Sequence, residues 1–143
     1  LDSLGFSNIA ESYLDNQKEN KEIKEEIVKV TTLDRLMINL PVSNKITFIK
    51  CDVEGAELMV FKGGMNFLSK YHPTILCEIE EKNTDRYEYK PEELIDFLKN
   101  FNYDIFIFVS GKLTSIKKVQ KSIINYIFIH KSLINKYIKS GIL

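Results

Sequence analysis

The 143 residues, 44% of them hydrophobic and 28% charged, have the composition of one globular domain rather than of a disordered or membrane protein. The 20 basic and 20 acidic residues balance, and the two arginines, Arg35 and Arg86, are too few for a cluster that reads phosphates or guanine. No apolar run approaches the roughly 18–20 residues that cross a bilayer, and no signal peptide is visible, so we expect a cytoplasmic protein without nucleic-acid or membrane partners.

Five stretches rich in apolar and β-branched residues predict β-strands. They are residues 27–33, 46–51, 74–79, 103–109 and 123–130. The stretch 46–51 lacks a clean alternation of apolar and polar residues, which is typical of a strand covered on both faces. Apolar residues at helical spacing predict one helix over residues 56–68 and another that begins at Pro91 and stops before Asn102.

Shorter features complete the expected fold. Residues 1–26 show no sustained period and should be mostly loop. A short helix over residues 34–40 would be capped by its first residue, Asp34, and the tail from Ser132 could form a last amphipathic helix. The pair Gly63-Gly64 should weaken the helix that contains it, by about 1 kcal/mol per glycine against alanine, or let that helix pack closely on the sheet.

The order strand, helix, strand, helix, strand, strand predicts an α/β fold with a mostly parallel sheet and an antiparallel final strand. In open α/β sheets ligands bind beyond the carboxyl ends of the strands. Asp52 and Glu54 directly follow the strand 46–51, and Glu78 and Glu80 end the next one. The sequence therefore predicts an acidic pocket where two neighbouring parallel strands end.

Several of these charged residues also have a purely structural explanation. Lys50 lies inside a predicted buried strand and needs a partner, either Asp52 or Glu78. Asp52 would then neutralise Lys50. Glu54 would interact favourably with the positive end of the following helix, and Glu57 would be a solvated residue of the first helical turn. Two carboxylates without a third ligand make a weak magnesium site, so we predict no metal.

Other reactive side chains give weaker signals. Cys51 and Cys77 lie in apolar strands and are expected to be buried free thiols rather than a disulfide. His72 and His130 have no companion at a catalytic or ligand spacing, which favours surface or packing roles. Tyr87 and Tyr89, in the charged loop over residues 80–90, could contact a sugar or another ring-shaped acceptor, or lie on a loose surface loop.

The segment FIKCDVEGAEL at residues 48–58, followed by Lys62 and Gly63, resembles the signature of the FkbM-type methyltransferase family. Its flanks agree with this. They are TLD at residues 32–34, Pro73 with ILCE at 75–78, and NYIF at 125–128. The resemblance runs from about residue 30 to residue 130, and it implies S-adenosylmethionine as cofactor and the Rossmann-like class I methyltransferase fold.

Such enzymes hold the cofactor with a glycine-rich turn after the first strand, and none of the six glycines here forms such a cluster. We therefore expect residues 1–143 to be the C-terminal half of the domain, with on the order of 100 residues before it and no cofactor-binding residue of its own. A chain cut at that point would leave an edge of the strand 46–51 uncovered, and it should aggregate or dimerise there.

The resemblance implies a methyltransferase that acts on oxygen, with a saccharide or a small natural product as acceptor. Asp52 and Glu54 are the predicted catalytic residues, because a carboxylate within hydrogen-bond reach can take the proton of an acceptor hydroxyl. Glu78 and Lys50 are predicted to bind the acceptor. Two alternatives stay open: a non-catalytic remnant or scaffold of the same fold, and a magnesium-dependent phosphoryl-transfer enzyme.

Overall fold

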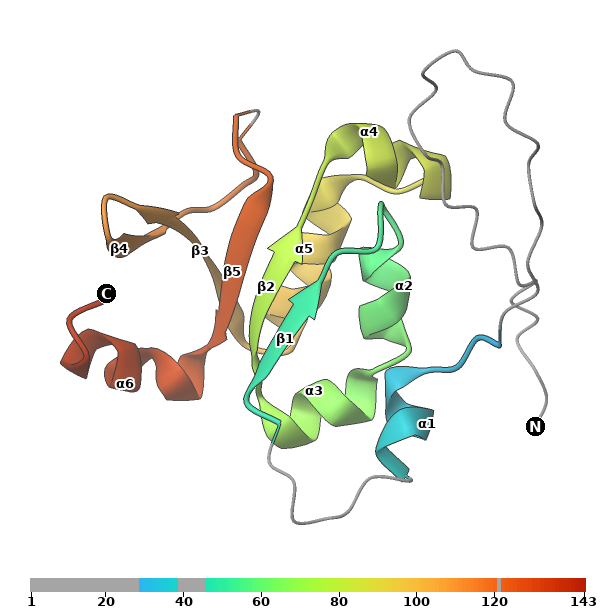
Figure 1. The fold of residues 1–143 in the computed structure, drawn as a ribbon, viewed down its shortest axis with the longest axis horizontal. Coiled ribbons are helices and arrows are strands. Elements are labelled where there is room, and N and C mark those ends of the chain that lie inside the picture. Colours follow the sequence, from blue (N-terminus) through green and yellow to red (C-terminus); the bar gives the residue numbers. More distant parts are fainter. Residues whose placement is uncertain (1–28, 39–45, 121) are drawn as a thin grey trace. The chain divides into compact units, whose positions relative to one another are not determined.

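The computed structural model describes residues 29–38, 46–120 and 122–143. The chain divides into two compact units, Leu1–Thr31 and Thr32–Leu143. In the first unit the described residues, 29–31, are exposed and belong to no helix or strand. The helices and strands in Figure 1 all belong to the second unit. The loop predicted for residues 1–26 lies outside the described residues.

Five described strands form one sheet in the order β1-β2-β5-β3-β4. They are β1 (Phe48–Cys51), β2 (Thr74–Glu78), β3 (Tyr103–Val109), β4 (Lys112–Ser115) and β5 (Asn125–His130). β1 pairs parallel to β2, whereas β5 runs antiparallel between β2 and β3, and β4 forms an antiparallel hairpin with β3. The antiparallel final strand is confirmed. The expectation of a mostly parallel sheet is wrong for these strands, because β5 separates β2 from β3 and leaves one parallel pairing.

Six α-helices and two short 3-10 helices accompany the described strands. The α-helices are α1 (Leu33–Ile38), α2 (Glu57–Lys62), α3 (Met65–Tyr71), α4 (Glu81–Thr84), α5 (Pro91–Asn100) and α6 (Ile134–Lys139); the 3-10 helices are η1 (Asp85–Tyr87) and η2 (Lys131–Leu133). α5 begins at Pro91 as predicted, and Asn102 follows it in the left-handed conformation with φ 63°. Over the described residues, no helix combines the length and the apolar character needed to cross a membrane.

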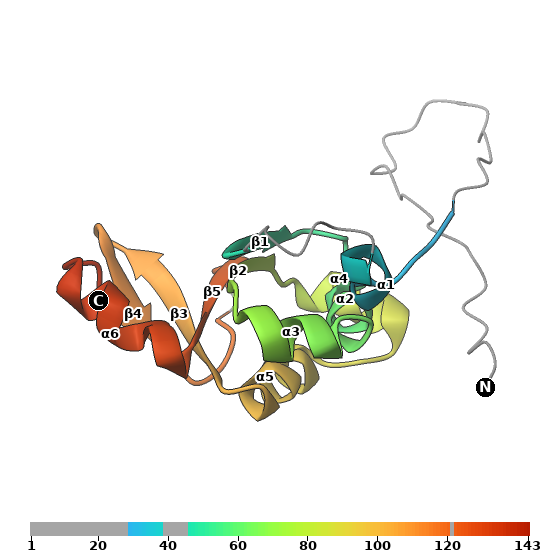
Figure 2. The ribbon, with the colours of Figure 1, turned by 90° about the horizontal axis from the view of Figure 1, so that it is seen from below.

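The main core lies between one face of the sheet and the helices α2, α3 and α5, which lie together on one side of β1 and β2 in Figure 2. Its fully buried members include Phe61, Leu68, Ile75, Leu94, Leu98, Tyr126 and Phe128. Because side chains alternate along a strand, Phe106 and Ile129 point to the opposite face, where they pack with Ile134 and Tyr137 of α6. Helices therefore lie on both faces of the sheet. On the face opposite the main core, α6 covers the part formed by β3 and β5.

Two predictions about the start of the described chain and the first strand are wrong. Residues 29–32 form no strand, and Leu33 is the first residue of α1. β1 is not covered on both faces: Phe48 is 54% exposed, and Cys51 is the one buried residue of its four. Among the described strands β1 has a neighbour on one side alone, and helices cover only the face to which Cys51 points.

The helix predicted over residues 56–68 is two helices, α2 and α3, which break at Gly63 and Gly64. A Cβ at Gly63 would lie 3.2 Å from Cβ of Thr32, and one at Gly64 would lie 2.9 Å from Cδ1 of Leu33. The glycines thus permit close packing, but against the start of α1 rather than against the sheet.

Asp34 caps a helix other than its own. Its carboxylate accepts hydrogen bonds from the backbone N–H groups of Phe67 (2.8 Å) and Asn66 (3.1 Å), at the start of α3. The first turn of α1 is capped by Thr32, whose Oγ1 accepts from the backbone N–H of Arg35 at 3.2 Å. The prediction that Asp34 caps α1 is therefore wrong, and Asp34 ties α1 to α3.

Candidate acidic site at the carboxyl edge of the sheet

The structure brings the predicted carboxylates together at one edge of the sheet. Cys51 of β1 and Cys77 of β2 are partners in the parallel register, so Asp52 and Glu78 follow at the same edge. Partial burial raises the pKa of Glu78, and the negative charges of Asp52, Glu80 and Glu54 raise it further. Two neighbouring parallel strands therefore end in a shared acidic site.

Lys50 is paired with Asp52, as predicted, but for a different reason. Its Nζ lies 2.6 Å from Oδ2 of Asp52, and this contact raises the pKa of the lysine. The prediction rested on burial, yet the Lys50 side chain is 58% exposed, because the face of β1 to which it points is open. An exposed ion pair of this kind contributes little to stability, but it restrains the direction of the Asp52 carboxylate.

Glu54 and Gly55 form the turn between β1 and α2. Glu54 is exposed and left-handed, with φ 54°, and its Oε2 accepts a 2.9 Å hydrogen bond from Nδ2 of Asn83 on α4. Gly55 has φ 107°, and a Cβ there would lie 2.3 Å from the carbonyl oxygen of Asn83. The turn is thus packed directly against α4, and glycine is required both for the backbone angle and for the close approach.

Glu57 was predicted to be solvated, and this is wrong. The residue is 2% exposed, and its Oε1 accepts hydrogen bonds from the backbone N–H groups of Val53 (3.2 Å) and Gly55 (3.1 Å). At the first position of α2, its side chain folds back over the preceding turn, much as an acidic residue does in a capping box. A glutamate two residues after the turn glycine was the sequence signal for this contact.

Tyr89 closes the same turn from the other side. Its hydroxyl lies 2.7 Å from the carbonyl oxygen of Gly55 and 3.2 Å from Oε2 of Glu57, so its single proton is shared between two acceptors. Burial, together with the nearby charge of Glu57, raises the pKa of Tyr89. At 5% exposure Tyr89 cannot contact an acceptor, and that predicted role is excluded.

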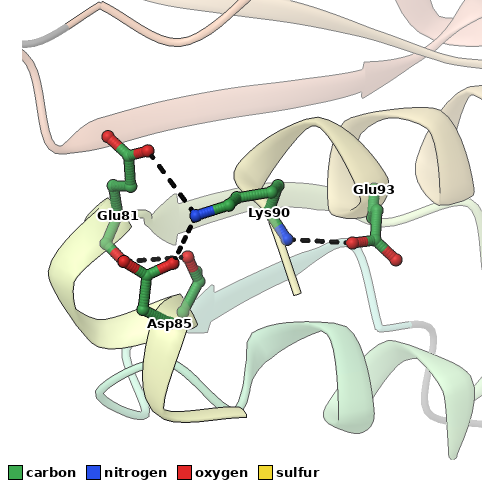
Figure 3. A network of polar contacts seen from close by, with 5 residues as sticks. Glu81, Asp85, Lys90 and Glu93 are labelled. Carbon is green, nitrogen blue, oxygen red and sulfur yellow. Dashed lines mark hydrogen bonds and ion pairs between the residues drawn. The ribbon is translucent and has the colours of Figure 1, made fainter. Parts of the chain in front are cut away.

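The segment that carries Tyr89 is fastened to α4 by its neighbour Lys90 (Figure 3). Nζ of Lys90 lies 2.7 Å from Oδ1 of Asp85 and 3.9 Å from Oε1 of Glu81. The backbone N–H of Lys90 donates to Oε1 of Glu93 at 2.9 Å, which caps the start of α5. These contacts join α4, η1 and the start of α5, and Asn83 and Tyr89 connect this stretch to the acidic turn.

The two histidines and the two cysteines take no part in this site. The rings of His72 and His130 stack at 3.7 Å with an angle of 3°, at the opposite end of β2, and Nδ1 of His130 contacts Oγ of Ser132 at 2.7 Å. They are packing residues, as expected. Cys51 and Cys77 are buried free thiols, also as expected.

Comparison with known protein families decides what kind of domain carries this site. The family described as the methyltransferase FkbM domain matches residues 2–105, which include β1, the acidic turn, β2 and α5. The chain belongs to the FkbM methyltransferase family. It matches none of the curated proteins and none of the solved structures. The family match begins earlier and ends earlier than the resemblance read from the sequence, and both contain Asp52, Glu54 and Glu78.

FkbM methyltransferases imply a methyl-donor cofactor, and the described glycines do not form a cradle for one. Gly55, Gly63 and Gly64 are packed against atoms of the protein itself, and Gly111 and Gly141 lie in open turns. In the part of the chain that the structure describes, no three His, Cys, Asp or Glu side chains gather so that they could hold a metal ion.

Proposed function

We propose that the chain is the acceptor-binding part of an S-adenosylmethionine-dependent methyltransferase that acts on a hydroxyl of a saccharide or small natural product. The observation that carries this proposal is the convergence of Asp52, Glu54 and Glu78 at one edge of the sheet in a member of a methyltransferase family. We further propose that β1, β2, β5 and β3 are the later half of a Rossmann-like sheet, with the antiparallel β5 inserted between parallel-running strands.

The carboxylates would prepare the acceptor. The donor supplies an electrophilic methyl group, and a hydroxyl is a poor nucleophile until its proton leaves. Asp52 or Glu54 would accept that proton, an effect worth typically 10²–10⁴-fold in rate. Lys50 would hold the Asp52 carboxylate in place and donate to an acceptor oxygen with its remaining N–H groups. No described residue is assigned to the donor.

Glu78 is proposed to bind other hydroxyls of the substrate that receives the methyl group. It is also a third candidate for the group that takes the proton. Its raised pKa brings its basicity closer to neutral pH, which also suits a general base. The four carboxylates at this edge, those of Asp52, Glu54, Glu78 and Glu80, argue against an anionic acceptor and against phosphoryl transfer, because like charges repel.

The test measures methyl transfer from labelled S-adenosylmethionine to a panel of neutral saccharides by the full-length protein that contains this chain. Asp52→Asn and Glu54→Gln should each lower turnover and leave donor affinity nearly unchanged, and the variant that loses the proton-accepting group should show the larger loss, about 10²–10⁴-fold. Glu92→Gln, on the exposed first turn of α5, is the matched control and should turn over like the wild type. Wild-type turnover in both site variants would remove these residues as catalysts, and absence of donor binding would favour a scaffold.

A further inference from the structure

We propose that Glu57 and Tyr89 are positioning residues for the acidic site, which fix the Asp52–Gly55 turn and so set the directions of the Asp52 and Glu54 carboxylates. Neither residue would touch the acceptor, because both are buried. This proposal rests on the proposed function only for the reaction that the site catalyses. The restraint itself can be measured without any methyl transfer.

The contacts of Glu57 hold the peptide group that directly follows Asp52 and the one that directly follows Glu54. The N–H of Val53 belongs to the peptide that follows Asp52, and the N–H of Gly55 belongs to the peptide that follows Glu54. Both donate to the same carboxylate oxygen of Glu57. Fixing these two peptide planes restrains the backbone torsions from which the Asp52 and Glu54 side chains project.

Tyr89 completes the restraint at the next peptide. The carbonyl of Gly55 receives the Tyr89 hydroxyl at 2.7 Å, so the turn is held through both N–H and C=O groups. The same hydroxyl also lies 3.2 Å from Glu57, which couples the two residues. A buried carboxylate is costly unless it is hydrogen-bonded, and here the bonds are all to this turn or to Tyr89.

The backbone of Glu54 indicates what the restraint is for. A residue other than glycine at φ 54° is strained, and such residues persist where the surroundings determine them. Asparagine or glycine would adopt this angle more readily, yet the position carries a longer carboxylate that is exposed and held by Asn83. The turn therefore keeps a strained residue that presents a charged group to solvent.

The experiment follows the titration of Glu78 by carboxyl ¹³C NMR in Tyr89→Phe and Glu57→Gln. Because the charges of Asp52 and Glu54 help to raise the pKa of Glu78, loosening the turn should move its titration midpoint toward lower pH. Turnover should fall about tenfold to a hundredfold with KM for the donor unchanged, as expected for misplaced catalytic groups.

Two other buried tyrosines provide controls. Tyr126→Phe removes hydrogen bonds to the 120–123 loop and should lower stability without moving the Glu78 titration. Tyr103→Phe removes a buried hydroxyl that has no hydrogen-bond partner among the described residues, and it should change neither. If Tyr89→Phe leaves both the Glu78 midpoint and the Val53 and Gly55 amide shifts at wild-type values, the proposal is wrong, even if Glu57→Gln fails to fold. A moved midpoint in a protein that methylates nothing would uphold the proposal and refute the proposed function.

Discussion

Replacing Gly55 with alanine should be among the most damaging single-methyl changes in the described chain. The backbone angle φ of 107° is one that residues with a Cβ rarely adopt, at a strain of about 1–3 kcal/mol. In addition, the new Cβ would lie 2.3 Å from the carbonyl oxygen of Asn83, which is backbone and cannot rotate away. The turn or α4 must therefore shift.

That shift adds a second contribution to the loss. Moving α4 away from the turn breaks the hydrogen bond between Asn83 and the carboxylate of Glu54, and a bond to a charged group contributes about 1.5–3 kcal/mol. Strain and contact loss together give about 2.5–6 kcal/mol, a large part of the 5–15 kcal/mol typical of a whole domain. Urea unfolding followed by far-ultraviolet circular dichroism measures this loss as the change in free energy of unfolding.

Gly111 is the matched control for this substitution. It also has a positive φ, 83°, but a Cβ there would meet nothing within 4 Å. Gly111→Ala should therefore show the strain alone, about 1–3 kcal/mol, and the excess loss in Gly55→Ala measures the contact with Asn83. Equal losses in the two variants, within about 0.5 kcal/mol, would show that the turn is not packed on α4 as described.

Four further substitutions probe other contacts by the same unfolding measurement. Asp34→Ala should cost about 1–2 kcal/mol, because it uncaps the start of α3, whereas an unchanged stability would refute the link between α1 and α3. Tyr126→Phe should cost about 1–3 kcal/mol by leaving loop groups unpaired, while Tyr103→Phe should cost nothing measurable; similar losses would contradict the assigned hydrogen bonds. Burial and the neighbouring His72 lower the pKa of His130 below 6.5 in the folded state, so the unfolded state binds more protons as pH falls. Stability should thus decrease between pH 7.5 and 5, less so in His130→Asn, and an identical slope in that variant would exclude His130 as the cause.

The sequence predicted those parts of the fold that depend on hydrophobic periodicity and on the residue preferences at helix ends. The strand predicted over residues 74–79 is observed as Thr74–Glu78, and the helix that begins at Pro91 and the left-handed Asn102 were confirmed. The acidic edge was predictable because parallel strands end on the same side and each carries its acid directly after its apolar run.

The errors arose where tertiary contacts override local patterns. The period of residues 56–68 predicted one helix, and the glycine pair was expected to weaken that helix rather than to divide it. Both glycines pack against Thr32 and Leu33, which come from a distant segment and which the period does not show. The short strand β4 was missed since its four residues, Lys112–Ser115, carry a single buried apolar side chain, Leu113. Lys50 was expected to be buried because a strand pattern does not show whether a strand lies at the edge of a sheet.

Glu57 shows why the site itself was only half predicted. From sequence, an acid in the first turn of a helix is most simply a solvated residue that favours the helix dipole. Its buried carboxylate contacts the hydroxyl of Tyr89, which lies 32 residues away along the chain, between α4 and α5. The exposed pairs of this site, such as Lys50 with Asp52, are screened by solvent and cannot hold the carboxylates in place alone. On the proposal that Glu57 fixes the turn, the buried acid sets the backbone from which the exposed acids project, and a site read only from its solvent-facing carboxylates omits it.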